Sequence, residues 1–375
     1  MPNRPPAGQS PMSVHVLDAM AREGFEELVA LHDRKSGLRA FLGLHDTSAG
    51  PAFGGIRRWS YVDERQALLD CLRLARAMTW KCALAGVPGG GGKTVVLERP
   101  ELDRPAAYQA LGEAVERLGG RYYTGPDVGT GQAELEQLAA RTHYVTRPDE
   151  QGPGDLSEAT ATGVFAGMRA ALLHLDADED WTRRTVVVQG LGGVGAGLAR
   201  RLVEVGARVV ACDLDADRAH SVASELELEL VEPEESLDVE CDVLAPCALG
   251  GVLHDLSLLR LRCRAIAGAA NNQLARTMHG DRVHERGILL VPDVVLNAGA
   301  LILGATFHLE GVRPGEDEIA RRVGESVREV LERARAESRP PTRVALDEAR
   351  ARVEARRAEA DGAASRAPGD ELLKT

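Results

Sequence analysis

The second half of the chain alternates short apolar runs with longer segments of helical periodicity. The apolar runs cover residues 185–189, 208–212, 242–246, 264–268 and 288–292. Apolar runs of this length with helical segments between them are typical of parallel strands that are buried on both faces. We therefore predict a doubly wound, Rossmann-type α/β domain at about residues 155–325.

The first half of the chain has a different pattern. Strand-like sequence between about residues 25 and 44 is broken by Lys35-Ser36-Gly37, which predicts a hairpin. Residues 63–79 place apolar side chains at helical spacing, with Asp63 as a candidate N-cap. A second helix is expected at 105–118, and short strands at 94–97 and 121–124. These elements predict an α/β substrate and catalytic domain at residues 13–150, separated from the Rossmann-type domain by a cleft.

The two ends of the chain differ in composition from the rest. Residues 1–12 contain four prolines, and we expect a disordered leader there. Residues 317–357 are strongly helical, and we expect the helices at about 330–357 to rejoin the N-terminal domain. Residues 358–375 are rich in Ala, Gly, Asp and Glu and are predicted to form a frayed tail.

Composition narrows the class of protein. The chain has 375 residues, enough for two domains, and its net charge of −12 argues against a nucleic-acid or anionic membrane surface. Its six cysteines form no CxxC pair and no histidine cluster has metal-ligand spacing, so we expect reduced thiols and no metal. We find neither a signal peptide nor an apolar run long enough to cross a bilayer, and expect a cytoplasmic protein.

Lysine is scarce in this chain, and its positions carry information. Of the 45 basic residues four are lysines, which leaves 41 arginines. Two of the four, Lys81 and Lys93, lie twelve residues apart around the run Gly89-Gly90-Gly91-Gly92. Arginine cannot lose its proton in a protein, whereas a desolvated lysine can. We therefore expect a glycine loop that presents Lys93 for chemistry that needs a neutral amine.

A dinucleotide-binding pattern follows the apolar run at 185–189. The run leads directly into Gly190-Leu191-Gly192-Gly193-Val194-Gly195, then a helix, and then a second strand that ends at Cys212-Asp213. Such glycines permit a tight turn, close approach to a pyrophosphate and close helix packing, and the helix N-terminus favours phosphate. Asp213 can bind the ribose hydroxyls and would repel a 2′-phosphate. NAD is therefore the expected cofactor rather than NADP.

Together the two halves resemble the glutamate, leucine, phenylalanine and valine dehydrogenase superfamily, from about Leu38 to Val353. The likeness is greatest to the leucine and valine branch. It is carried by short motifs in one order: Gly54-Gly55-Ile56-Arg57, Met78-Thr79-Trp80-Lys81, Gly90-Gly91-Gly92-Lys93, Asp127-Val128-Gly129-Thr130, Ala245-Pro246-Cys247-Ala248-Leu249-Gly250, Gly268-Ala269-Ala270-Asn271-Asn272-Gln273, and Pro292-Asp293 followed by Asn297-Ala298-Gly299.

The resemblance implies a role for each site. It implies that Lys81 holds the substrate carboxylate, that Lys93 is the catalytic lysine and that Asp127 is its acidic partner. It places further residues on the substrate side, namely Phe53, Gly54, Met78, Gly125, Asn272, Leu301 and Gly304. It places Thr160, Asn272 and Asn297 beside the nicotinamide, and it implies a homo-oligomer. The implied reaction is NAD-dependent oxidative deamination of an L-amino acid to a 2-oxo acid, ammonium and NADH.

The side chain of the substrate is less sharply indicated. In glutamate dehydrogenases the position that resembles Phe53 is a lysine, which pairs with the side-chain carboxylate of the substrate. A substrate carboxylate facing Phe53 would lack such a partner. We therefore expect a leucine, valine or isoleucine type of substrate. Gly125 and Gly304 open space that Phe53 fills, so phenylalanine is the alternative. A further alternative is a catalytically silent homologue that binds NAD(H) and has a regulatory role.

Overall fold

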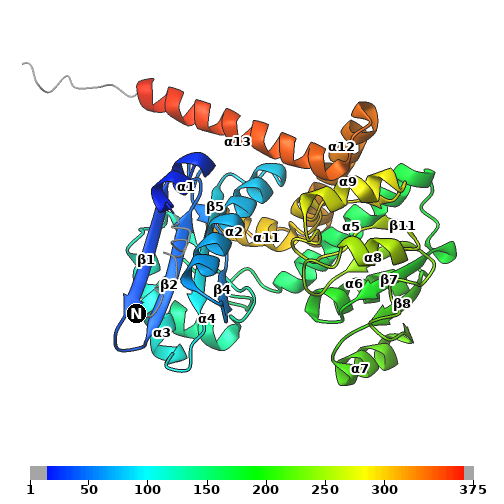
Figure 1. The fold of residues 1–375 in the computed structure, drawn as a ribbon, viewed down its shortest axis with the longest axis horizontal. Helices are drawn as coiled ribbons and strands as arrows, with labels where there is room; N and C mark the ends of the chain where they lie inside the picture. The colour runs from blue at the N-terminus through cyan, green and yellow to red at the C-terminus, as the bar shows by residue number, and fades with distance from the viewer. Residues whose placement is uncertain (1–14, 367–375) are drawn as a thin grey trace, which may run out of the picture. The chain divides into compact units, whose positions relative to one another are not determined.

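The computed structural model describes residues 15–366, with side chains to residue 362, and divides them into two units (Figure 1). The expected leader at 1–12 lies outside the described residues. Unit 1 comprises residues up to Thr79 together with Gly89–Val145, and unit 2 comprises Trp80–Pro88 together with residues from Thr146 onward. The predicted cleft between the two domains stays a prediction.

Unit 1 is a mixed sheet with helices on both faces. Its elements are α1 (Val16–Glu23), β1 (Glu27–Asp33), β2 (Leu38–Leu44), β3 (Ala52–Phe53), β4 (Ile56–Trp59), α2 (Glu64–Leu84, which ends in unit 2), β5 (Gly90–Leu97), α3 (Arg104–Glu116), β6 (Tyr122–Tyr123) and α4 (Gln132–Ala139). The strand order is β1-β2-β5-β3-β6, and β4 pairs with the far end of β5.

The core of unit 1 lies on the two faces of this sheet. Alternating side chains of the central strands point to opposite faces, as period-2 strands require. On one face Val96 packs with Leu111 and Leu138 of α3 and α4. On the other face Val95 packs with Ala67 and Cys71 of α2. The central strand β5 is therefore covered on both sides, and the predicted hairpin is confirmed as β1 and β2.

Unit 2 contains the predicted Rossmann sheet. Its elements are α5 (Leu156–Asp176), the 3-10 turn Trp181–Arg183, β7 (Thr185–Gln189), α6 (Gly193–Glu204), β8 (Arg208–Cys212), α7 (Ala216–Leu226), β9 (Glu229–Leu230), β10 (Cys241–Pro246), α8 (Asp255–Arg260), β11 (Cys263–Ile266), α9 (Thr277–Glu285), β12 (Leu289–Leu290), α10 (Asp293–Leu296), α11 (Gly299–Glu310), α12 (Glu316–Glu337) and α13 (Pro341–Arg366).

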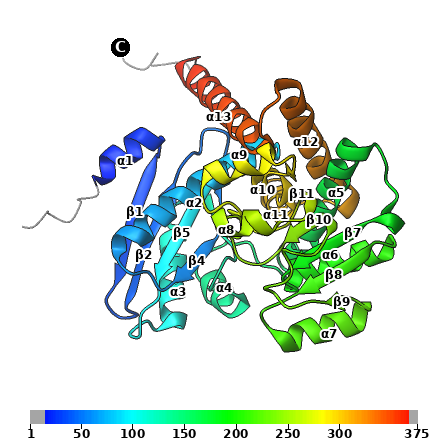
Figure 2. The same ribbon diagram turned by 45° about the vertical axis from the view of Figure 1, so that its right-hand side comes forward.

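The strand order of unit 2 is that of a dinucleotide-binding fold. The order β12-β11-β10-β7-β8-β9, with parallel pairings throughout, is the doubly wound order 3-2-1-4-5-6 read from the other edge. Helices α8 and α9 pack on one face through Leu258 and Val283. Figure 2 shows α5 and α6 on the other face. The doubly wound α/β class predicted from the apolar runs is confirmed.

Two features of the C-terminal region differ from the expectation. Helices α12 and α13 group with unit 2 rather than rejoining the N-terminal domain, because α12 packs along α5. The helix α13 continues to Arg366, so residues 358–366 of the expected frayed tail are helical. The remaining residues of that tail lie outside the described range.

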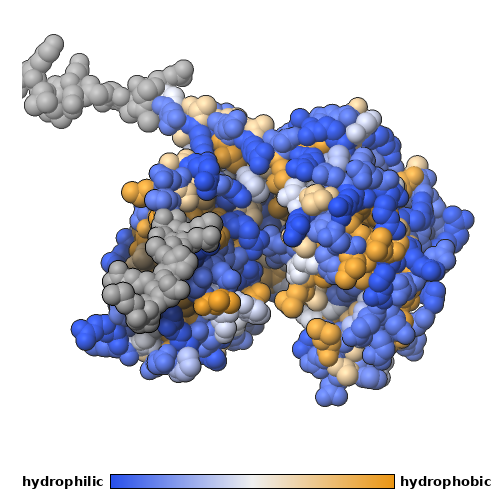
Figure 3. Space-filling view, in the orientation of Figure 1, coloured by the Kyte–Doolittle hydropathy of each residue, from blue (hydrophilic) through white to orange (hydrophobic). Residues whose placement is uncertain are grey.

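Several large apolar side chains are exposed on the surface of unit 2. Figure 3 shows a hydrophobic patch over the short helix α8, where Leu256 and Leu259 are exposed. Between residues 15 and 366 no helix is long and apolar enough to cross a membrane. The six cysteines, all within this range, are free thiols.

Candidate functional site

Lys93 lies on the buried central strand of unit 1. We expected the four glycines and Lys93 to form a loop, but Gly90–Gly92 and Lys93 begin strand β5, whose residues are all buried. The Lys93 side chain is only 7% exposed. The glycines are needed for packing rather than for flexibility. A Cβ at Gly91 would lie 2.1 Å from the backbone nitrogen of Thr79 and 2.4 Å from the Ala75 carbonyl oxygen, so α2 approaches β5 at backbone contact.

Asp127 is the ion-pair partner of Lys93. It follows β6 in a turn closed by the Thr130 N–H, which donates to the Asp127 carbonyl at 2.9 Å. The carboxylate oxygen Oδ2 lies 2.6 Å from Lys93 Nζ and accepts a hydrogen bond from Arg57 Nε at 3.1 Å. Burial raises the pKa of Asp127, but the charges of Lys93 and Arg57 outweigh it and hold that pKa well below its usual range.

The ion pair continues beyond Asp127 through Arg57. Arg57 Nη1 donates to Asp70 Oδ2 at 3.3 Å, and that oxygen also accepts from the Tyr61 hydroxyl at 2.7 Å. Arg73 donates to the second oxygen of Asp70 at 2.6 Å. Burial raises the pKa of Asp70. The hydrogen bonds from Tyr61 and Arg73 and the charges of Arg73 and Arg57 have the larger, opposite effect, so the pKa of Asp70 is lowered overall. Positive and negative groups therefore alternate from Lys93 to Arg73, all within unit 1.

Lys81 lies on helix α2. The predicted helix at 63–79 extends to Leu84, so Lys81 is in the last turn of α2, in the segment assigned to unit 2. Lys81 Nζ donates to Asn271 Oδ1 at 3.2 Å, and the same oxygen accepts from Asn297 Nδ2 at 2.9 Å. Desolvation raises the pKa of nearby Asp293, against the opposing effects of the Asn272 N–H and the charge of Lys81.

The residues that the family resemblance places on the substrate side are divided between the units. Unit 1 carries Phe53, Gly54, Met78 and Gly125; Phe53 is 4% exposed and stacks on Tyr123 at 5.5 Å between ring centroids. Unit 2 carries Asn272, Leu301 and Gly304, the last two on α11. Asn272 has φ +54°, an uncommon backbone conformation for a residue other than glycine, and its N–H is bound by Asp293. The two sets are thus built on separate frameworks.

The glycine run after β7 has the geometry that a pyrophosphate needs. Gly190 turns the chain with φ +95°, and a Cβ at Gly195 would lie 1.9 Å from the Gly190 carbonyl oxygen, so α6 packs directly on the turn. A Cβ at Gly192 would meet no atom within 4 Å, which leaves open space before the N-terminus of α6. Gly193 and Val194 form the first turn of that helix. The loop therefore fits a dinucleotide.

Two further groups bear on the nucleotide. Asp213 Oδ2 accepts from the Leu191 N–H at 2.7 Å, so the acid at the end of β8 holds the glycine loop. Thr160 is buried on α5, where its hydroxyl donates to the Leu156 carbonyl at 2.8 Å. Asn297 Oδ1 is buried and finds no hydrogen-bond partner among the described residues, so it is available to accept a hydrogen bond from an amide.

Comparison with known proteins places these features in a family. The family model "Glu/Leu/Phe/Val dehydrogenase, dimerisation domain" matches residues 26–144. The family model "Glutamate/Leucine/Phenylalanine/Valine dehydrogenase" matches residues 152–218 and 214–338. The chain belongs to this family. It is an amino-acid dehydrogenase, and NAD is its cofactor.

Relatives with different substrates match this dehydrogenase about equally well. Leucine dehydrogenase of Thermoactinomyces intermedius is 41% identical over 76% of this chain and 79% of its own length. Phenylalanine dehydrogenase of the same organism is 40% identical over 79% of this chain and 82% of its own length. The crystal structure of L-tryptophan dehydrogenase from Nostoc punctiforme superposes with a TM-score of 0.79 at 32% identity, covering 91% of this chain and 99% of that one. Overall identity therefore does not decide the substrate.

Reasoning from sequence missed several residues of this dehydrogenase that the structure brings to the site. Arg57, Asn271 and Asp293 all occur in the motifs that carry the family resemblance, but no role was assigned to them. Asp70 and Tyr61 had no signal in the sequence. They are found only because Arg57 reaches both Asp127 and Asp70.

Proposed function

We propose that the protein catalyses the reversible NAD-dependent oxidative deamination of an apolar L-amino acid of the leucine, valine or isoleucine type. The observation that carries the reaction is the buried ion pair between Lys93 on strand β5 and Asp127 in the turn after β6, with Nζ and Oδ2 2.6 Å apart. A lysine and a carboxylate in contact can exchange protons with a bound substrate, and such groups work best when a sheet fixes their positions.

The residues divide the chemistry as follows. NAD, when bound, accepts the hydride from the substrate Cα. Lys81 binds the α-carboxylate, Lys93 takes a proton from the water that attacks the resulting iminium carbon, and Asp127 exchanges protons with the substrate nitrogen until ammonia leaves. Amino acid, water and NAD⁺ give 2-oxo acid, ammonium, NADH and one proton. The pyrophosphate is assigned to Gly190, Gly192, Gly193, Val194 and Gly195, and the ribose to Asp213.

Contact between Lys93 and Asp127 couples their proton transfers. While Lys93 carries its proton, Asp127 is held as a carboxylate by two cations and is a weak base. When Lys93 gives up its proton, the nearest positive charge disappears and Asp127 becomes more basic.

Phe53 supports the apolar choice of substrate. Its ring is almost fully buried against Tyr123, which itself meets Tyr144 edge to face at 5.4 Å. A carboxylate placed against this aromatic cluster would lose its hydration without gaining a partner. Glutamate is therefore disfavoured. The second candidate is an aromatic amino acid, which is favoured by the absence of side chains at buried Gly125 and Gly304.

The test is NADH formation at alkaline pH with leucine, valine, isoleucine, phenylalanine, tryptophan and glutamate, with NADP as a parallel cofactor. A preference for the aliphatic substrates with NAD supports the proposal. A preference for phenylalanine or tryptophan would overturn the aliphatic choice. No turnover despite NADH binding would favour the silent homologue. Phe53→Lys should introduce glutamate activity, whereas the matched variant Phe53→Leu should not.

Assembly and location belong to the same proposal. We infer a homo-oligomer, supported by a match to a family model described as a dimerisation domain. A cytoplasmic location is supported by the six free cysteines. Light scattering of the purified protein and fractionation of the source cells test these two points.

A further inference from the structure

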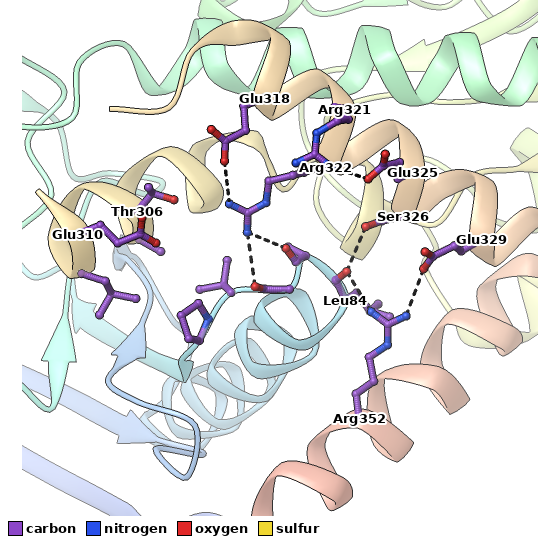
Figure 4. Close-up of a pocket in the computed structure, with 16 residues that line it drawn as sticks. Leu84, Thr306, Glu310, Glu318, Arg321, Arg322, Glu325, Ser326, Glu329 and Arg352 are labelled. Atoms are coloured by element: carbon purple, nitrogen blue, oxygen red, sulfur yellow. Dashed lines mark hydrogen bonds and ion pairs between the residues drawn. The ribbon is translucent and has the colours of Figure 1, made fainter. Parts of the chain in front are cut away.

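The end of helix α2 is held by side chains from the two C-terminal helices. Five consecutive carbonyl groups, those of residues 83–87, accept hydrogen bonds from α12 and α13. Figure 4 shows those made by Arg322 and Ser326 and the one from Arg352 to Leu84. Arg322 donates to the carbonyls of Ala85 and Gly86 at 3.0 and 3.5 Å, and Ser326 Oγ donates to that of Leu84 at 3.2 Å. We call Arg322, Ser326, Arg352 and Arg356 the α2 clamp.

The two arginines of α13 complete the clamp. Arg352 donates to the carbonyls of Ala83 and Leu84, each at 3.5 Å, and Arg356 to that of Val87 at 3.1 Å. The last carbonyls of a helix lack intrahelical partners and carry partial negative charge, so cationic donors are favoured there. Three guanidinium groups at one helix end exceed what capping requires, because the backbone already ends the helix at Gly86 with φ +63° and a Val87 N–H bond to Cys82.

The position of Lys81 in this turn gives the clamp a consequence for the reaction. The Lys81 carbonyl accepts from the Ala85 N–H at 2.9 Å, so Lys81 belongs to the same turn whose following carbonyls are clamped. Its Nζ donates to Asn271, which is also bound by Asn297. The backbone and the ammonium group of this turn are therefore fixed independently, both to elements of unit 2.

We propose that the α2 clamp positions Lys81 for the substrate carboxylate, with Arg322 and Arg352 as its principal positioning residues. This inference rests on the proposed function, in which Lys81 binds that carboxylate. The clamp touches neither substrate nor cofactor. It fixes the turn from which Lys81 extends, and a small displacement of that turn moves the ammonium away from the carboxylate.

A pocket beside the α2 clamp allows a chemical rescue experiment. Arg322 and Arg352 line a pocket of about 440 Å³ together with Glu318 and Glu329, and Figure 4 shows both guanidinium groups beside the α2 end. Removal of either side chain would leave a water-filled space next to the carbonyl groups. A small guanidinium ion could enter that space and restore the missing hydrogen bonds.

The experiment compares Arg322→Ala with Arg321→Ala, a matched control. Arg321 is the preceding residue of α12, is largely exposed and pairs with Glu325 on its own helix at 2.8 Å. Arg322→Ala and Arg352→Ala should raise KM for the amino acid about tenfold, since small misplacements of substrate-binding groups are costly, and should change KM for NAD less than twofold. Arg321→Ala should resemble wild type. Millimolar methylguanidinium should lower the raised KM of Arg322→Ala.

Ser326→Ala tests the clamp with a smaller change, in case Arg322→Ala or Arg352→Ala fails to fold. It removes one hydrogen bond to Leu84 and should raise KM for the amino acid about two- to threefold with little change in Tm. An active wild type with equal KM values for Arg322→Ala, Ser326→Ala and Arg321→Ala would overturn the clamp while leaving the proposed function intact. A wild type that turns over no amino acid would overturn both.

Discussion

Lys81 and Lys93 are twelve residues apart, yet their surroundings are opposite. Lys93 lies on a buried strand and is paired with the carboxylate of Asp127 at 2.6 Å. Lys81 lies in the last turn of a helix and donates to the neutral amide oxygen of Asn271 at 3.2 Å. An ammonium bonded to an amide can exchange that bond for a stronger, charge-assisted bond to a substrate carboxylate. An ammonium bonded to a carboxylate is arranged to exchange a proton. The contrast between the two partners is what supports the proposed division of roles, with Lys81 as the binding group and Lys93 as the catalytic group.

The largest effect is expected from replacing Lys93. Lys93→Ala removes the proton-exchanging group and should lower kcat by about 10³- to 10⁴-fold. Lys93→Arg keeps the positive charge beside Asp127 but cannot deprotonate, so it should be nearly as inactive. Steady-state kinetics with NADH binding as the folding control measure both variants. Substantial activity in Lys93→Arg would show that Lys93 serves only as an ion-pair partner, and the distinction between the two lysines would fail.

Asp127→Asn should have the next largest effect. Loss of the carboxylate should lower kcat about 10²-fold and, because it leaves two buried cations, reduce the free energy of unfolding at pH 7 by about 3 kcal/mol. The folded-state pKa of Asp127 is lowered, so its stabilisation is fully present above the unfolded pKa of about 4 and is lost as pH falls through the folded value. Urea unfolding should therefore show the difference from wild type shrinking below about pH 4. A constant difference from pH 7 to pH 3 would contradict this assignment.

Much of the fold could be predicted because periodicity and glycine spacing are local signals. Strands β7 and β8 begin and end where their apolar runs do, and the pairings of both are parallel, as the alternation of apolar runs with helical segments predicts. The grouping of α12 and α13 depends on contacts with α5, far away in sequence. No local pattern encodes such a contact, so the expectation that they rejoin the N-terminal domain differed from the structure.

The site was predicted less completely, for a similar reason. Lys93 and Asp127 could be named from motifs, and the structure places them in contact. The four glycines were interpreted as a loop because glycine is usually flexible, whereas Gly90–Gly92 form a strand in which each missing side chain admits a neighbouring segment. Asp70 could not be found, because a carboxylate on a helix face is ordinary until Arg57 is seen to reach it.

Gly91→Ala tests whether the two lysine segments depend on the same backbone contact. The new Cβ would overlap the Thr79 nitrogen and Ala75 oxygen of α2, so we expect a loss of about 2–3 kcal/mol in stability from forced separation of helix and strand. Gly324→Ala on α12 is the control. Its Cβ would lie at van der Waals distance from Ala166, 3.7 Å from the carbonyl oxygen and 3.9 Å from the Cβ, so the substitution should stabilise the fold by about 0.5–1 kcal/mol. Thermal unfolding measures both. Equal Tm values would show that α2 adjusts freely over β5.

The smallest effect is expected from Asp70→Asn, because Asp70 does not contact Asp127 directly but pairs with Arg57, which in turn pairs with Asp127. Arg57 forms ion pairs with both Asp70 and Asp127. Asparagine keeps the shape of the Asp70 side chain but removes its negative charge, which leaves Asp127 as the only carboxylate of the two that pairs with Arg57. Arg57 should then act more strongly on Asp127, make it a weaker base and lower kcat about threefold, which corresponds to less than 1 kcal/mol. Asp33→Asn in the β1–β2 hairpin is the matched control. The Asp33 carboxylate accepts hydrogen bonds from the N–H and hydroxyl of Ser36, so this substitution should leave kcat unchanged. If Asp70→Asn lowers Tm but leaves kcat equal to that of Asp33→Asn, the charges beyond Arg57 stabilise the fold without influencing Asp127, and the catalytic cluster ends at Arg57.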